Sequence, residues 1–157
     1  MSAEDLRVAA WFCRWCAATA ADAAGTSRMK QDPRVVPQRI PCTGALDPLV
    51  VLRALVDGAD GVLVVGCHPG DCHYLHGNYR ARRRLTVLRT VLETFDLQPE
   101  RLRLRWAGAS EPARLVDVVN RAAADAEALG PSAARGLSPA APPRSNGGEK
   151  RRATKKD

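Results

Sequence analysis

The sequence predicts a single three-layer α/β domain, in which a mainly parallel sheet of about four strands lies between helices. Short apolar segments rich in valine or leucine recur along the chain, and a segment with helical character follows each of them. Strands that alternate with helices in this way pair in parallel through right-handed crossovers. The chain of 157 residues is 45% hydrophobic but only 4% aromatic, which suits one ordinary domain with an aliphatic core.

Four segments are expected to form the strands: Leu6–Phe12, Val35–Ile40, Gly61–Val65 and Leu102–Trp106. The third is the most apolar, and a short valine-rich run bounded by glycine is typical of a buried strand. Pro37 places the second strand at an edge of the sheet, because proline has no N–H to donate to a neighbouring strand.

Helices are expected between and after these strands: Ala17–Ala24, a helix that begins after Asp47, Asn78–Phe95 and Pro112–Leu129. Gly25 is a suitable C-cap for the first helix, and Asp47 followed by Pro48 is a typical start for the second. Four arginines crowd the first half of the third helix, where the helix dipole disfavours cations: Arg80, Arg82, Arg83 and Arg84. A solvated helix face is the ordinary explanation, and docking of an acidic partner is the alternative.

The C-terminal segment differs in composition from the rest of the chain. After Gly130 the sequence is rich in Pro, Ala, Gly, Ser and basic residues and has almost no large apolar side chains. Such a segment cannot offset the entropy of ordering, so we expect residues 131–157 to be disordered and residues 1–130 to form the domain. Seven of the 24 Lys and Arg residues but two of the 17 Asp and Glu residues lie in this tail, which leaves +2 for the domain. Although the whole chain carries +7, the near-neutral domain argues against a nucleic-acid partner.

The sequence also bears on the cellular compartment. It has no apolar run near the roughly 18 residues that span a bilayer, and its first residues lack the features of a signal peptide. We therefore expect a cytoplasmic protein without a membrane partner. In a reducing compartment, five cysteines are more typical of metal ligands or redox groups than of a disulfide framework.

The cysteines follow the expected strands. Cys13 and Cys16 come after the first strand, Cys42 after the second, and Cys67 and Cys72 after the third. Because the carboxyl ends of parallel strands meet at one edge of a sheet, we expect the five thiols to converge there.

Such a set of thiols fits more than one kind of site. Four thiolates hold a [2Fe–2S] or [4Fe–4S] cluster, although the spacing here matches no standard ferredoxin pattern. A structural zinc site would accept four thiolates, or three thiolates and an imidazole from His68 or His73. The Cys13-Arg-Trp-Cys16 segment, between a strand and a helix, is also compatible with a thioredoxin-type redox pair.

Several motifs together resemble a known family. They are Cys13-Arg-Trp-Cys16 with Ala21-Asp22-Ala-Ala-Gly25, Cys42-Thr-Gly44 with Asp47-Pro48, Gly58-Ala-Asp-Gly61, Gly66-Cys-His-Pro-Gly-Asp-Cys-His-Tyr74 and Gly77-Asn-Tyr79. Over about residues 6–130, this pattern resembles the delta subunit of methyl-viologen-reducing hydrogenase, and the string from Gly66 to Tyr74 is very specific.

The resemblance implies an electron-transfer subunit with a [2Fe–2S] cluster rather than a catalytic subunit. It implies that electrons come from a [NiFe] hydrogenase or another dehydrogenase and pass to a heterodisulfide reductase-like flavoprotein subunit. The implied ligands are drawn from Cys13, Cys16, Cys42, Cys67 and Cys72, of which four suffice, and we expect the spare thiol to be Cys13 or Cys16. A zinc-stabilised docking module without redox activity is the alternative.

Two features depart from the family pattern. Ala45 stands where the family commonly has arginine after Cys-x-Gly, and a charge near a cluster would affect its potential and its docking. The C-terminal tail resembles no part of the family domain.

Overall fold

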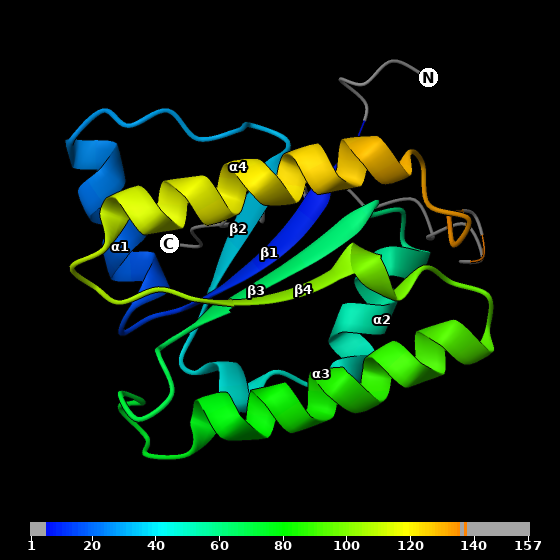
Figure 1. The fold of residues 1–157 in the computed structure, drawn as a ribbon, viewed down its shortest axis with the longest axis horizontal. Coiled ribbons are helices and arrows are strands. Elements are labelled where there is room, and N and C mark those ends of the chain that lie inside the picture. Colours follow the sequence, from blue (N-terminus) through cyan, green and yellow to red (C-terminus); the bar gives the residue numbers. More distant parts are fainter. Residues whose placement is uncertain (1–5, 136, 138–157) are drawn as a thin grey trace, which may run out of the picture.

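Four parallel strands form the sheet in the computed structural model, which describes residues 6–135 and 137. The strands are β1 (Val8–Cys13), β2 (Val35–Ile40), β3 (Gly61–Gly66) and β4 (Leu102–Trp106). Their order in the sheet is β2-β1-β3-β4, so β2 lies at an edge, as Pro37 predicted (Figure 1). The prediction of a mainly parallel sheet of about four strands is confirmed.

The helices are α1 (Ala17–Thr26), α2 (Pro48–Val56), α3 (Gly77–Thr94) and α4 (Pro112–Leu129). Asp47 caps α2 as expected, because its side chain accepts a hydrogen bond from the Leu49 amide. The prediction that Gly25 caps α1 is wrong. The helix continues to Thr26, and the backbone takes the left-handed conformation only at Arg28, with φ of 55°.

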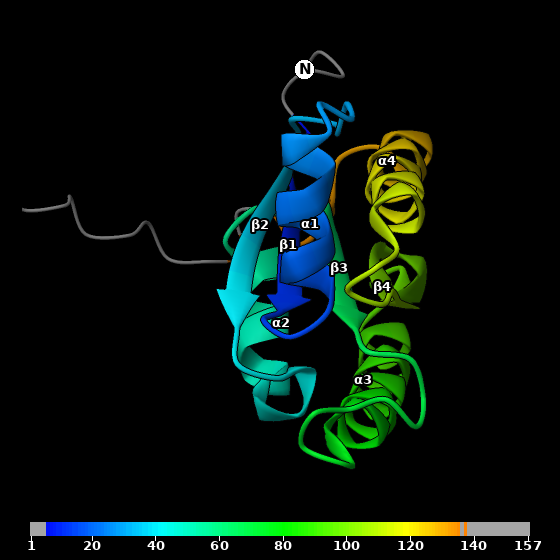
Figure 2. The ribbon, with the colours of Figure 1, turned by 90° about the vertical axis from the view of Figure 1, so that its left-hand side faces the viewer.

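The sheet lies between two layers of helices, as the two ribbon views show (Figures 1 and 2). On one face, alternate residues of β1 and β3 pack with α1 and α4, and on the other face the intervening residues pack with α2 and α3. Every residue of β3 is buried, because this central strand is covered on both faces. Within the described ranges, each helix is too short or too polar to span a lipid bilayer.

The order of the strands reverses between β1 and β3. The chain passes from β1 to β2 in one direction across the sheet, and later from β3 to β4 in the other. The connections that leave β1 and β3 therefore begin helices on opposite faces of the sheet, α1 on one and α3 on the other. Such a switch point leaves a crevice at the carboxyl ends of the two strands, where ligands of open α/β sheets bind.

A buried ionic network closes the opposite end of the sheet. Asp60, immediately before β3, is fully buried, and its carboxylate accepts hydrogen bonds from the amides of Arg7 and Ser132 and pairs with Arg135. The buried Arg101 donates to the carbonyl of Asp60 and to three carbonyls at the end of α4.

This network extends the packed part of the chain past Gly130, where the sequence predicted the tail to begin. Ser132 and Ala134 are buried, because Asp60 holds the segment against the sheet. The tail prediction for residues 138–157 lies outside the described residues.

Removal of the central carboxylate tests this network. Asp60→Ala leaves Arg135 without its buried counter-ion, and we expect the free energy of unfolding to fall by about 3 kcal/mol in urea titrations. Asp57→Ala is the matched control, because Asp57 forms an exposed, solvent-screened pair with Arg53. Equal effects of the two substitutions would contradict a structural role for the network.

Candidate metal centre

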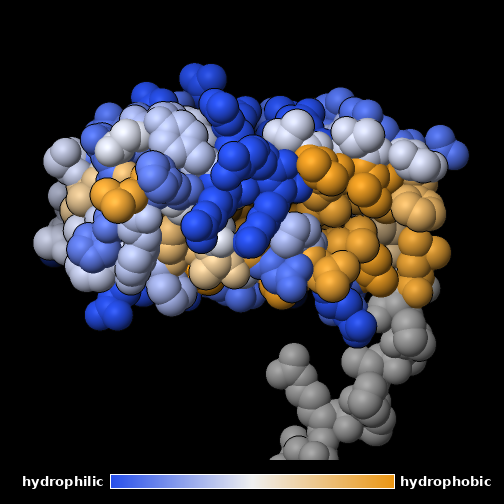
Figure 3. All heavy atoms as spheres, turned by 90° about the horizontal axis from the view of Figure 1, so that it is seen from below, coloured by the Kyte–Doolittle hydropathy of each residue, from blue (hydrophilic) through white to orange (hydrophobic). Residues whose placement is uncertain are grey.

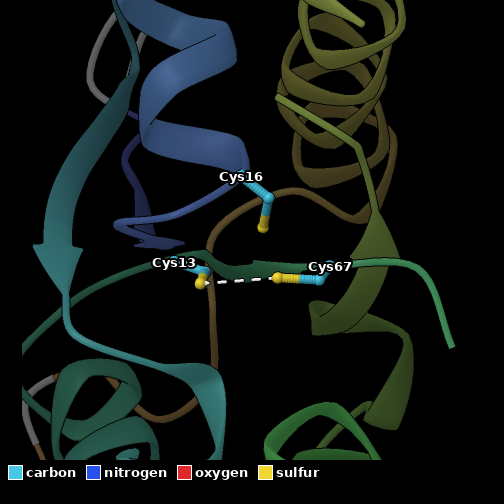
Figure 4. A group of neighbouring side chains, drawn as sticks. All are labelled: Cys13, Cys16 and Cys67. Atoms are coloured by element: carbon cyan, nitrogen blue, oxygen red, sulfur yellow. Dashed lines mark hydrogen bonds between the residues drawn. The ribbon is translucent and has the colours of Figure 1, made fainter. Parts of the chain in front are cut away.

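Three buried thiols meet at the switch point. Cys13 ends β1, Cys16 follows it before α1, and Cys67 comes directly after β3. The Cys13 and Cys67 sulfur atoms are 3.8 Å apart, and all three sulfur atoms lie within 4.8 Å of one another (Figure 4). Residues 54 positions apart in sequence are neighbours here because β1 and β3 are adjacent and in register, with Phe12 opposite Val65.

A second pair of thiols lies in the neighbouring loops. Cys42 follows β2, and Cys72 lies in the loop between β3 and α3. Their sulfur atoms are 3.9 Å apart, and both residues are buried. The structure thus arranges the five predicted ligands as a group of three and a group of two.

Two glycines allow α3 to approach the second pair. A Cβ on Gly44 would lie 2.6 Å from the Cα atom of Gly77, and a Cβ on Gly77 would overlap the Cys42 sulfur. The first residue of α3 therefore packs directly on the backbone after Cys42. Bulkier residues at either position would push the helix away from the thiols.

Backbone amides surround the sulfur atoms of this pair. The Gly44 amide donates to Cys42 at 3.4 Å. Burial raises the pKa of Cys72, but hydrogen bonds from the amides of Asn78, Tyr74 and Gly77 outweigh it, so this pKa lies below its ordinary value. Amides at the N-terminus of α3 thus favour a thiolate, the form that binds metal.

The group of three thiols also favours one thiolate. Hydrogen bonds from Cys16 and then Cys67 lower the pKa of Cys13 to about 2. The same contact with Cys13 raises the pKa of Cys67 to about 11, and it raises that of Cys16 well above its ordinary value. Two thiols therefore donate to a third that carries the negative charge.

The loop that bears Cys67 and Cys72 is held by two polar side chains that the sequence analysis did not single out as functional. Asn78 is buried, and its side-chain amide donates to the carbonyls of Cys67 and His68 at 3.2 and 2.7 Å. Glu111, before α4, contacts His68 Nε2 at 2.6 Å and accepts from the Gly108 amide. The Gly108 amide and then His68 lower the pKa of Glu111. A polar residue at the buried start of α3 was a signal for Asn78, but no local pattern identifies Glu111.

The histidines lie outside the thiol groups. His68 pairs with Glu111, His73 stacks on Trp15 with ring centres 3.8 Å apart, and His76 precedes α3 near Tyr79. Among the residues that the structure describes, the candidate metal group contains cysteines alone. Buried thiols with amide donors fit an iron–sulfur cluster or a thiolate zinc site, since both require soft sulfur ligands.

Comparisons with known proteins agree with a metal centre. A family model described as "Methyl-viologen-reducing hydrogenase, delta subunit" matches residues 8–130. The chain is 44% identical over 119 residues to the F420-non-reducing hydrogenase iron-sulfur subunit of Archaeoglobus profundus, and the match covers 76% of this chain and 87% of that protein. It is 38% identical over 125 residues to the iron-sulfur subunit of the vhc F420-non-reducing hydrogenase of Methanococcus voltae, covering 80% and 87% of the two chains.

A larger protein contains a similar segment. The chain is 39% identical over 124 residues to one of the subunits of the ferredoxin/F(420)H(2)-dependent CoB-CoM heterodisulfide reductase of Methanosarcina acetivorans. The match covers 79% of this chain but only 16% of that protein.

The close approach of α3 predicts the effect of one methyl group. Gly77→Ala displaces the Cys42 sulfur, so we expect loss of most bound metal and a lower melting temperature. Gly25→Ala is the control, because nothing lies within 4 Å of its added Cβ in α1. That substitution is expected to add about 0.5–1 kcal/mol of stability without loss of metal. Unchanged metal content in Gly77→Ala would contradict the proposed packing.

Proposed function

Since the chain belongs to the family of the methyl-viologen-reducing hydrogenase delta subunit, we propose that it is an iron–sulfur electron-transfer subunit. It relays electrons from a hydrogenase, or another dehydrogenase, to a heterodisulfide reductase-like flavoprotein in the cytoplasm. The observation that carries the proposal is the grouping of all five cysteines at one edge of the sheet, in buried positions with amide donors.

The cofactor is a [2Fe–2S] cluster held by two pairs of thiolates. Cys13 and Cys67 form one pair and Cys42 and Cys72 the other, with sulfur separations of 3.8 and 3.9 Å. Four cysteine ligands in two pairs suit a cluster with two irons. Cys16 is the fifth thiol, next to the first pair.

The rest of the site serves the cluster rather than a substrate. One-electron transfer is the chemistry that such a cluster supplies when it is bound. The amides of Gly44, Gly77 and Asn78 stabilise negative charge on the sulfurs of the second pair, and burial of the thiols excludes water. Both effects tune the reduction potential of an iron–sulfur centre.

The names of the relatives support the proposed partners. Several relatives are hydrogenase iron-sulfur subunits, and in Methanosarcina acetivorans a similar segment is part of a heterodisulfide reductase. A domain that occurs both as a hydrogenase subunit and within that reductase is suited to connect the two.

Metal analysis of the full chain tests the function. After anaerobic purification we expect about two iron and two sulfide per chain and an S = 1/2 EPR signal on reduction. One zinc per chain, without colour after expression with ample iron, would instead leave a structural docking module.

Single cysteine substitutions test the assignment of ligands. Cys16→Ser is expected to keep iron and sulfide near wild-type levels, whereas Cys42→Ser, Cys72→Ser and Cys67→Ser lose most of both. Iron, sulfide and the visible spectrum are measured together with the melting temperature of each variant. Loss of the cluster in Cys16→Ser, with retention in Cys13→Ser, would exchange the roles of these two residues.

A further inference from the structure

Large side chains lie exposed around the thiols, although side chains of this kind are usually buried. Trp15 is 43% exposed and Tyr74 is 53% exposed, and both belong to the loops that carry the cysteines. His73 stacks on Trp15 and contacts Tyr74 edge-on, and the Trp15 indole N–H lies 3.4 Å from the Tyr74 hydroxyl. Together with Leu75 these residues form what we call the loop rim. Rigid, exposed aromatic groups of this kind are typical anchors of protein interfaces.

Leu75 stands at the tip of this rim in an unfavourable conformation. Its φ is +67°, a value that a residue with a branched side chain rarely adopts, and its side chain is 72% exposed. Folding therefore gains little from leucine here, since the side chain is not buried and the backbone would suit glycine or asparagine better. Strained residues of this kind cluster at binding sites, where another molecule provides the missing contacts.

A hollow beside the rim leads to the metal centre. It has a volume of about 450 Å³ and is lined by Pro41, Cys42, Gly44, Ala45, Tyr74, Gly77 and Arg80. Tyr74 thus belongs to both the rim and the hollow, and Cys42 is the thiol that the hollow reaches. Electrons would leave the centre most directly here, because the small residues Gly44 and Ala45 separate Cys42 from the surface.

The charge around the hollow is mostly positive. Arg80, Arg82, Arg83 and Arg84 are exposed on the first half of α3, and the Arg84 guanidinium donates to the Gly44 carbonyl at 3.0 Å. Figure 3, drawn from the side of α3, shows strongly hydrophilic side chains gathered across the middle of this face. Arg14 lies 5.8 Å from the centre of the Trp15 ring, and the exposed Asp71 adds one negative charge in the same loop as Cys72.

We infer that the loop rim and the hollow form the docking surface for an acidic, partly apolar surface of a redox partner protein. The apolar tip at Leu75 and the Trp15–His73–Tyr74 stack provide the contact area, and the arginines of α3 select negative charge. The partner comes nearest to the centre through the hollow above Cys42. This inference rests on the proposed function, whose acceptor is a heterodisulfide reductase-like flavoprotein.

The strained leucine provides the first test. Leu75→Gly is expected to weaken binding of the cluster-loaded chain to the heterodisulfide reductase flavoprotein of the same organism about tenfold. Its melting temperature is expected to stay equal or rise, because glycine tolerates the positive φ. The control is Phe95→Ser, since Phe95 is 71% exposed at the other end of α3, a helix of 18 residues and about 27 Å. A control as weak in binding as Leu75→Gly, or full binding by Leu75→Gly, overturns the inference.

A change of charge inside the hollow provides the second test. Ala45→Glu and Ala45→Gln add nearly equal volume at the exposed Ala45, but only glutamate repels an acidic partner. We expect the glutamate variant to bind about fivefold more weakly than the glutamine variant in low salt, with a smaller difference above about 0.5 M salt. Equal binding at all salt concentrations contradicts an acidic partner surface at the hollow.

The same experiments separate this inference from the proposed function. Iron, sulfide and EPR of each protein are measured before binding, so a wild-type chain without a cluster contradicts the function and not the docking surface. A wild-type chain that carries its cluster but binds neither the reductase flavoprotein nor a hydrogenase overturns the docking surface.

Discussion

The parallel alignment of β1 and β3 is the constraint on which the metal centre depends. These two central strands are in register over their length, so the residues that follow them, Cys13 and Cys67, leave the sheet at the same level. The chain then turns toward α1 on one face and toward α3 on the other, and the space between the two connections holds the thiols. Because β2 is the other neighbour of β1, the loop that bears Cys42 reaches the same edge. A sheet with another strand order would separate these cysteines.

The two ends of the sheet have different physical roles. At the amino ends of the strands, a buried carboxylate at Asp60 and the guanidiniums of Arg101 and Arg135 satisfy one another and nearby backbone groups. At the carboxyl ends, loops replace regular structure, and backbone amides there donate to the sulfur atoms. Rigid strands and the ionic network at one end therefore support the functional loops at the other, an arrangement that is common in α/β proteins.

The start of α3 combines two demands that oppose each other. Its free amides stabilise thiolate at Cys72, which requires a close approach between Gly44 and Gly77. The same turn of the helix begins a row of arginines, which the helix dipole disfavours and whose mutual repulsion costs stability. An anionic metal centre beneath the helix and an acidic partner beside it both reduce this repulsion, so the function proposed for the site accounts for a local sequence that folding alone would not select.

The sequence by itself determined the elements and the residue types of the site. Valine-rich runs, the Asp47-Pro48 start of α2 and the cysteines after three strands are local signals, because helix caps and strand propensities depend on neighbours along the chain. Only the tertiary structure decided how the thiols are grouped, since the distances between Cys13 and Cys67 and between Cys42 and Cys72 depend on the order of the strands. It also decided the roles of Glu111 and of the segment at Ser132, whose partners lie 43 and 72 residues away. Contacts over such separations leave no periodic pattern in the sequence, and the packing of the sheet creates them.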